Sequence, residues 1–446
     1  MFSAFTNIFR VPELKSRVLF TFGVLLVYRI GIHIPIPGVN LSVLEDLFQK
    51  QTSGVLGFLN LFSGGALKQS SIFALGVMPY ISMSIILQLL TAVIPTLEKL
   101  SKEGEMGRRK ITQYTRIGTV ALCIIQGTGT TYLLRSFGEN AIYHWDLGFK
   151  IMTVLALTTG TIFIMWLGEQ ITEYGIGNGM SVIIFAGIVA GLPGQLVATY
   201  RMVRINEINL FSIIAFAAFT LLTIAFIVVL QQGARKIPVQ YATRVVGRQV
   251  FKGQSTVLPL KVDYSGVIAV IFASSILIFP AQIAKYVESI LSEKGLEESW
   301  FYGLMDLITR NFSPGAAFYY GCYSLLIVFF CYFYTAIAFN PTDLSENMKK
   351  YGGFIPGIRP GQPTAEFIDR TLTRITIWGA LAVCAVAVFP ELITKKLHIP
   401  IYFGGTSLLI IVGVALDTMK QIESHLLMRH YDGFMKKGRL KGRSAF

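Results

Sequence analysis

Charged residues are scarce in this sequence. Only 14% of its 446 residues are Asp, Glu, Lys or Arg, and 53% are hydrophobic. Soluble domains carry about a quarter charged residues, so long stretches here have no side chains suited to water. A chain of this length would otherwise suggest two or three soluble domains, but uninterrupted apolar runs override that expectation. The composition therefore indicates a protein that crosses a membrane several times.

Signatures of catalysis and metal binding are also missing. The sequence has no phosphate-binding loop, no His-Glu-x-x-His motif and no Gly-x-Ser-x-Gly nucleophile turn. The histidines are scattered, so they imply no metal cluster. The four cysteines lie inside apolar runs, where thiols usually behave as small hydrophobes: Cys123, Cys322, Cys331 and Cys384. We expect no enzyme activity, no cofactor and no metal.

Ten apolar runs are long enough to span a bilayer, which takes about 20 residues as a helix. They cover residues 18–34, 72–95, 114–134, 150–168, 180–198, 210–230, 264–284, 317–339, 372–392 and 402–421. Runs of this length favour helices over the short alternating segments of a membrane barrel. Pro79 lies inside the second run, where it removes a backbone donor and predicts a kink. The sequence thus predicts an all-α polytopic membrane protein.

The ten runs divide evenly at the loop 199–209, which we expect to be a hinge. An odd number of spans in each half means that the halves, 18–198 and 210–421, enter the membrane in opposite orientations, as inverted repeats do. Lys and Arg are more than twice as frequent in the loops on the side of the termini as in the opposite loops. This bias predicts that both termini are cytoplasmic. The basic charge sets topology, and it can also dock an acidic or RNA-containing partner.

The two ends of the chain carry polar or amphipathic segments. Residues 1–17 show no cleavable leader pattern and instead suit a short amphipathic segment on the inner membrane surface. Residues 422–446 form a basic tail that we expect to be mobile.

Two cytoplasmic loops, 231–263 and 340–371, are long. The first contains a basic, β-rich stretch, Ile237–Gln254, and the second contains a turn-rich stretch that ends near Arg359. They are either simply solvated or used for binding, since long loops with turn chemistry often carry function.

Residues 54–71 are apolar but too short to span, and they adjoin the second run directly. Backbone at membrane depth survives only when it is buried in protein or lines a wet cavity. The segment is therefore either an interfacial stretch at the outer surface or a re-entrant piece that occupies a pore, with Gly64 and Gly65 supplying its turn.

Ionisable groups are almost absent from the middle of the predicted spans. Arg29 and His33 lie near the outer end of the first span, where a long side chain can reach the interface. Glu169 and Asp417 lie at cytoplasmic ends. Ion-coupled transporters normally need such groups near the midplane, so a passive conduit fits better than a pump.

Several long stretches resemble the SecY family of protein-export channels, and they occur in the order of that family. They are Asn60–Ser71, Ser71–Leu90, Gly168–Pro193, Leu258–Ala284, Phe339–Gly361 and Ile399–Met419. The resemblance implies an hourglass channel of two inverted five-helix halves around a central pore. Unfolded polypeptide would pass through it, and apolar signal or membrane segments would leave sideways between spans two and seven.

The resemblance also implies roles for individual residues. It implies an apolar ring at the waist of the channel, formed by Val77, Ile81, Ile184, Ile188, Ile271 and Ile410. It implies a plug at about 54–68, which includes Phe58, Asn60, Phe62, Ser63, Gly64 and Gly65. Polar residues of a lateral gate would be Ser82, Gln88, Ser274 and Ser275. Taken alone, these aliphatic residues would be ordinary helix packing and these serines ordinary interhelical contacts.

The resemblance further implies partners. Arg244, Arg248 and Arg359 would dock the motor ATPase (SecA) and the ribosome, which supply energy. Small SecE-like and SecG-like subunits would complete the channel in the bacterial inner membrane, among its lipids, and secretory preproteins and nascent membrane proteins would be its clients. The alternatives are a secondary transporter of a small solute, which the inverted halves alone would permit, and an intramembrane enzyme.

Three positions depart from the family pattern. Val77 stands where Ile is more common, which would soften the ring. Ala269 replaces a frequent Pro, which predicts a straighter span seven, and Asp263 replaces Asn, which adds a charge at the cytoplasmic mouth.

Overall fold

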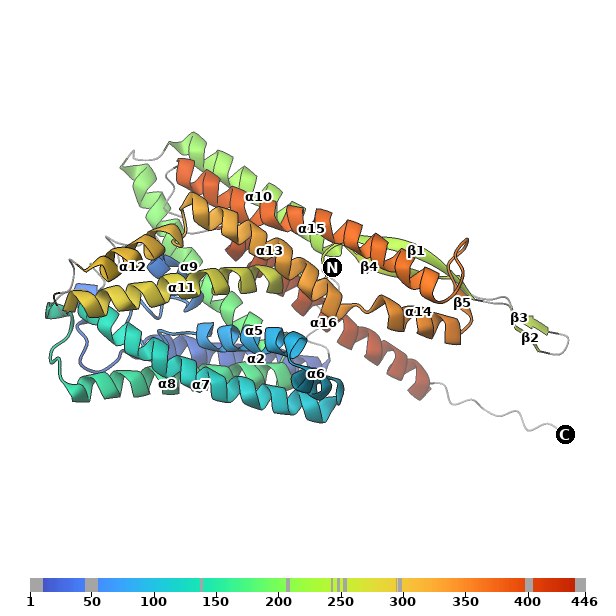
Figure 1. The fold of residues 1–446 in the computed structure, drawn as a ribbon, viewed down its shortest axis with the longest axis horizontal. Coiled ribbons are helices and arrows are strands. Elements are labelled where there is room, and N and C mark those ends of the chain that lie inside the picture. The colour runs from blue at the N-terminus through green and yellow to red at the C-terminus, as the bar shows by residue number, and fades with distance from the viewer. Residues whose placement is uncertain are drawn as a thin grey trace. The chain divides into compact units, whose positions relative to one another are not determined.

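The computed structural model describes residues 11–44, 55–136, 139–205, 209–241, 244–246, 249–251, 255–293, 295, 299–397 and 404–437. These residues are mainly helical, with two small groups of strands (Figure 1). The longer helices are α2 (Pro12–Ile32), α5 (Met78–Val93), α7 (Glu105–Ser136), α8 (Leu147–Tyr174), α9 (Gly179–Arg204), α10 (Leu210–Gln232), α11 (Ile268–Glu293), α13 (Ala317–Ala338), α15 (Gln362–Leu397) and α16 (Gly405–Lys437). The shorter ones are α4 (Val55–Phe62), α6 (Pro95–Lys102), η1 (Glu139–Ala141), α12 (Trp300–Asn311) and α14 (Pro341–Lys350). The predicted N-terminal segment lies outside the described residues up to residue 10.

Every predicted span coincides with one of the ten longer helices. Among the described residues, eight helices are long and apolar enough to cross a membrane, or nine if the bent pair α5 and α6 is one span. Helix α2 is not among them, because a spanning stretch of 18 residues should carry no more than two charged residues. Every such stretch of α2 includes at least three of Glu13, Lys15, Arg17 and Arg29. The chain is therefore a multi-span α-helical membrane protein.

The predicted kink at Pro79 is wrong. Helix α5 begins at Met78, and Pro79 occupies its first turn, where no intrahelical hydrogen bond is lost. Residues 72–77 form turns instead of the helical start that their hydropathy suggests. The sharp bend lies at the other end, where α5 and α6 meet at 101° next to Pro95. The residue before a proline disfavours helical backbone, and Ile94 is extended.

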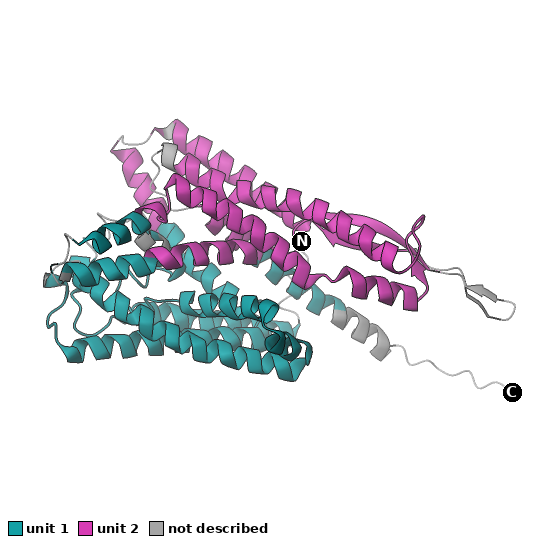
Figure 2. Ribbon diagram, in the orientation of Figure 1, with its two compact units in different colours: residues 1–193, 282–309, 414–446 teal, residues 194–281, 310–413 magenta. Residues whose placement is uncertain are grey.

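Contacts between residues divide the chain into two compact units (Figure 2). Unit 1 contains Met1–Pro193, Gln282–Thr309 and Val414–Phe446, and unit 2 contains Gly194–Ala281 and Arg310–Gly413. Helices α9, α11 and α16 each contribute to both units, so the units are not the two sequence halves predicted above. Helix α9 also continues to Arg204, which makes residues 199–204 of the predicted hinge helical.

Parts of the two long loops of unit 2 fold together into one lobe, which we call the strand lobe (residues 234–241, 255–261 and 341–372). Strands β1 (Ala234–Tyr241), β4 (Ser255–Lys261) and β5 (Gly353–Phe354) form an antiparallel sheet in the order β4-β1-β5. Ala234 pairs with Lys261 and Gln240 pairs with Ser255. A hairpin of β2 (Arg244–Val246) and β3 (Gln249–Phe251) lies between β1 and β4 in the chain.

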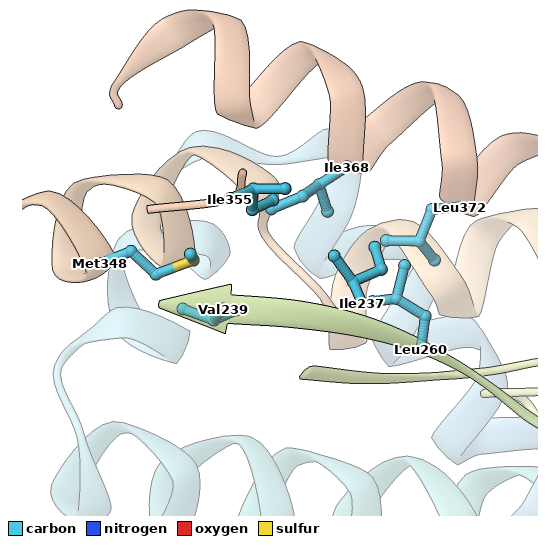
Figure 3. Packing of buried hydrophobic residues seen from close by; sticks show 7 residues of the cluster. All are labelled: Ile237, Val239, Leu260, Met348, Ile355, Ile368 and Leu372. Atoms are coloured by element: carbon cyan, nitrogen blue, oxygen red, sulfur yellow. The ribbon is translucent and has the colours of Figure 1, made fainter. Parts of the chain in front are cut away.

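The core of the strand lobe explains why the two loops fold together. Alternate residues of β1 point inward and meet side chains of α14, α15 and the segment after β5 (Figure 3). The buried set is Ile237, Val239, Leu260, Met348, Ile355, Ile368 and Leu372. Since each loop supplies only part of this core, neither has enough apolar surface to fold alone.

Candidate functional site

Residues 55–76 form a compact segment whose one helix, α4, has eight residues, too few to cross a membrane. After α4 the chain turns at Gly64 and Gly65, whose φ angles of +67° and +92° favour glycine, as the sequence predicts. Asn60 Oδ1 accepts a hydrogen bond from the Lys68 backbone N at 2.9 Å. Ser63 Oγ donates to the Asn60 carbonyl at 3.1 Å. These bonds close the segment on itself, so it is a folded unit and not a loose loop.

Helix α2 holds the turn of this segment from one side. Tyr28 donates its hydroxyl to the Ser63 carbonyl at 3.3 Å, and the Arg29 guanidinium donates to the Gly64 carbonyl at 3.2 Å. The Tyr28 ring is buried and stacks on Phe73, with 6.1 Å between ring centroids. Sequence reasoning assigns Arg29 only to snorkelling and does not single out Tyr28. The only feature of the sequence that could have drawn attention to Tyr28 is that a tyrosine occurs within an apolar run.

Helix α9 holds the turn from another side by direct contact of backbones. A Cβ atom added at Gly64 would lie 2.9 Å from the Gly187 Cα, and one added at Gly187 would lie 3.1 Å from the Gly64 Cα. Gly187 stands next to Ile188 and three residues after Ile184, both of the predicted ring. Glycine at both positions lets the turn lie directly on α9 beside these two residues.

All six predicted ring residues are buried. Ile81, Ile184 and Ile410 expose 6%, 2% and 0% of their surface, so none is on the outer face of the protein. Val77 is the residue before α5, and its carbonyl accepts from the Ile81 backbone N at 3.1 Å. Val77, Ile81, Ile184 and Ile188 belong to unit 1, whereas Ile271 and Ile410 belong to unit 2.

Two of the four predicted gate residues make hydrogen bonds within their own helices. Gln88 donates to Ser84 Oγ at 3.4 Å, and Ser274 donates to the Ile271 carbonyl at 2.9 Å. Ser275 is buried, and its Oγ has no hydrogen-bond partner among the described residues. Ser82 is half-buried on α5.

A buried polar chain between α7 and α11 escapes the sequence reasoning. Gln282 Nε2 lies 2.6 Å from the Tyr286 hydroxyl, which lies 3.0 Å from Thr130 Oγ1. Thr130 itself donates to the Gln126 carbonyl at 2.8 Å, so the hydroxyl of Tyr286 donates to Thr130 and accepts from Gln282. The spacing of Gln282 and Tyr286, four residues apart in an apolar helix, is the signal that could have revealed it.

Of the three predicted docking arginines, the structure describes two. Arg359 is exposed on the turn between β5 and α15, where Gly357 and Gly361 have φ angles of +85° and +105°. The Thr364 hydroxyl donates to the Arg359 carbonyl at 2.8 Å and fixes the turn. Arg244 begins β2 opposite Phe251. Arg248 lies outside the described residues.

An ion pair joins two long helices of unit 1. Arg116 on α7 donates from Nε and Nη2 to the two carboxylate oxygens of Glu169 on α8, both at 2.8 Å. The pair borders a cavity of about 550 Å³ that Tyr80, Glu173 and Asn178 also line. Among the described residues, no group of three or more His, Cys, Asp or Glu is placed to hold a metal ion. The four cysteines are free thiols.

Comparison with known proteins identifies the family. The SecY family model matches residues 71–419. The chain is 49% identical to the protein translocase subunit SecY of Pseudomonas aeruginosa, over 97% of this chain and 95% of the relative. This chain belongs to the SecY family. It is 47% identical to the Escherichia coli K12 subunit, over 96% of each chain, and 45% identical to the Thermus thermophilus subunit over the whole of both.

Solved structures show the same fold at lower identity. A structure described as that of a protein-conducting channel superposes with a TM-score of 0.62 at 16% identity, covering 96% of this chain and 95% of that one. Sec61 in a canine ribosome–channel complex superposes with a TM-score of 0.59, also at 16% identity, covering 96% and 95%. Its membership of the SecY family makes this chain a non-catalytic channel subunit of the protein translocase, and the solved structures show that it has the same fold.

Two of the departures from the SecY family pattern have local structural roles. Asp263 accepts hydrogen bonds from Ser265 Oγ at 2.6 Å and from the Gly266 N at 2.9 Å, so it closes the turn that leads into α11. Ala269 is fully buried in the first turn of that helix.

Proposed function

We propose that this translocase subunit carries unfolded polypeptides across the bacterial inner membrane, through a path whose waist is the six-residue ring. Residues 55–68 close that path at rest. The observation that supports this most is the seat of the turn at Gly64 against Gly187, beside Ile184 and Ile188. A folded apolar segment that lies next to two ring residues suits a removable stopper.

Apolar side chains suit the waist because they can surround a moving chain of any sequence without binding it. Branched aliphatic residues form no hydrogen bonds with the peptide, and a dry constriction resists the passage of ions. Apolar client segments then leave sideways into lipid between α5 and α11. The buried hydrogen-bond chain from Gln282 through Tyr286 to Thr130 links the outer part of α11 to α7. Together with Ser82, Gln88, Ser274 and Ser275, we count it among the candidate polar groups that keep this lateral exit closed.

The remaining parts of the proposal concern topology and partners. Both termini and the strand lobe are cytoplasmic, in keeping with the excess of Lys and Arg on that side. Arg359 on the strand lobe and Arg244 on the hairpin of β2 and β3 contact the motor ATPase SecA or the ribosome. SecE-like and SecG-like subunits stabilise the channel within the membrane.

Crosslinking to a stalled client tests the path. In a variant without native cysteines, we expect single cysteines at positions 81, 184 and 410 to crosslink to a secretory chain arrested in transit. Ile86 on α5 and Leu196 on α9 expose 39% and 64% of their surface, so cysteines there are matched controls that should react with lipid probes. Crosslinks from 86 and 196 but not from 81 and 184 would reject the proposed ring.

The hydrogen bond from Tyr28 of α2 to the plug predicts a moderate increase in ion leak when it is removed. Tyr28→Phe keeps the stacked ring but removes the bond to Ser63, which contributes about 0.5–1.5 kcal/mol. We expect a resting ion leak about two- to tenfold above that of the parent channel, measured in planar bilayers. Tyr143→Phe, at a tyrosine that is 65% exposed, is the control for loss of a phenol hydroxyl. Equal leaks from both variants would show that the Tyr28 hydroxyl does not help to hold the plug in place.

A further inference from the structure

Helix α12 carries an apolar stripe that the proposed function does not use. Trp300, Leu304 and Leu307 expose 78%, 43% and 59% of their surface. They are spaced four and three residues apart, so they lie along one face of the helix. No residue of α12 is buried in the protein. Three large apolar side chains in a row on an exposed helix indicate a non-aqueous neighbour.

A hydrogen bond to α11 fixes which way this stripe points. Thr309 Oγ1 donates to Glu288 Oε1 of α11 at 2.8 Å. Thr309 follows Trp300 by nine residues, which places it about 180° around the helix. The side of α12 opposite the stripe therefore faces α11, and the stripe faces away from it.

The position of α12 in the chain indicates that this non-aqueous neighbour is the membrane. It lies between α11 and α13, which are both among the helices able to span a membrane. The chain connects it to these helices through two short segments, residues 294–299 and 312–316. Helix α12 is thereby kept at the membrane surface where α11 ends and α13 begins. Tryptophan and amphipathic helices are both characteristic of that interface.

We propose that α12 lies in the plane of the bilayer, with Trp300, Leu304 and Leu307 inserted among phospholipid acyl chains. The charged residues of α12, Asp306 and Arg310, have opposite signs, so apolar insertion and not attraction to anionic lipid holds the helix there. Because Thr309 is bonded to Glu288, the helix anchors the end of α11 to the lipid surface. This proposal does not depend on the plug, the ring or the docking site.

A nitroxide scan of α12 tests this in the full-length chain, assembled with its translocase partners in phosphatidylcholine vesicles. Single labels at positions 304 and 307 are compared with labels at the two charged positions, 306 and 310, which lie about 160° and 120° around the helix from 304. We expect 304 and 307 to be relaxed several-fold more by oxygen, which concentrates in acyl chains, than by a water-soluble nickel complex. The ratio should reverse at 306 and 310.

Two results of this scan would overturn the proposal. Strong relaxation of 304 and 307 by the nickel complex would place the stripe in water, and weak relaxation by both agents would place it under protein. Quenching of Trp300 fluorescence by brominated phosphatidylcholine, with Trp145, Trp166 and Trp378 replaced by Phe, gives a second readout. Quenching that disappears in 1 M salt would indicate electrostatic attachment and contradict acyl-chain insertion.

Discussion

Replacing Gly187 by valine is expected to raise the resting ion conductance of the channel about tenfold or more. A Cβ atom at this position would lie 3.1 Å from the Gly64 Cα, and the two methyl groups of valine would extend further into the turn. Overpacking of this kind costs about 1–3 kcal/mol, which the plug avoids by leaving its seat. Conductance of purified, reconstituted translocase in planar bilayers measures the effect.

Helix α9 offers a matched control for this substitution. A Cβ atom at Gly194, seven residues further along the helix, would have nothing within 4 Å. Gly194→Val changes helix propensity by the same amount as Gly187→Val but meets no neighbour. We expect it to leave the conductance at the parental level. If both variants leak equally, or neither leaks, the contact between Gly64 and Gly187 does not seat the plug.

Reversing the charge of Arg359 is expected to reduce motor-driven export by about thirtyfold or more. A guanidinium can form two parallel hydrogen bonds with a carboxylate or phosphate, and placing a carboxylate there turns attraction into repulsion. Loss of such a buried interfacial pair typically costs 2–5 kcal/mol. The backbone carbonyl of Arg359, which accepts from Thr364, is unchanged, so the turn should keep its shape. Translocation of a preprotein into inverted membrane vesicles provides the measurement.

Two further variants separate docking from general charge effects. Lys110→Glu makes the same change of charge at an exposed position of α7, outside the strand lobe, and should export normally. Arg359→Lys keeps the charge but loses the two-pronged geometry, so its activity should fall between parent and Arg359→Glu. Normal export by Arg359→Glu, with normal amounts of the protein in the membrane, would show that this arginine does not dock the motor.

Hydropathy predicts the helices of this protein well because crossing a bilayer is a local requirement. Each of the ten predicted runs contains a helix. In lipid, a single run of about 20 apolar residues can pair all its backbone N–H and C=O groups only by forming a helix. The Gly64–Gly65 turn was also predictable, because positive φ angles select glycine. The start of α5 was not, because residues 72–77 are as apolar as the helix that follows.

Contacts between distant segments were beyond the reach of the sequence. Gly187 contacts Gly64, and Tyr28 bonds to Ser63, but nothing in the local sequence of either residue specifies its partner. The strand lobe shows the same limit, since β5 joins β1 from more than 100 residues away in the chain. Pore-facing and lipid-facing isoleucines are chemically identical, so burial of Ile184 and Ile410 emerges only when the helices are packed.

The most direct test of the account asks whether water reaches the waist when the plug is out. Single cysteines at positions 81, 184 and 410 are exposed to a charged, membrane-impermeant thiol reagent, at rest and with a stalled preprotein in transit. The account predicts little modification at rest and rapid modification at all three positions during transit. Cysteines that stay unreactive to this reagent in both states, yet react with a lipid-soluble maleimide, would contradict it.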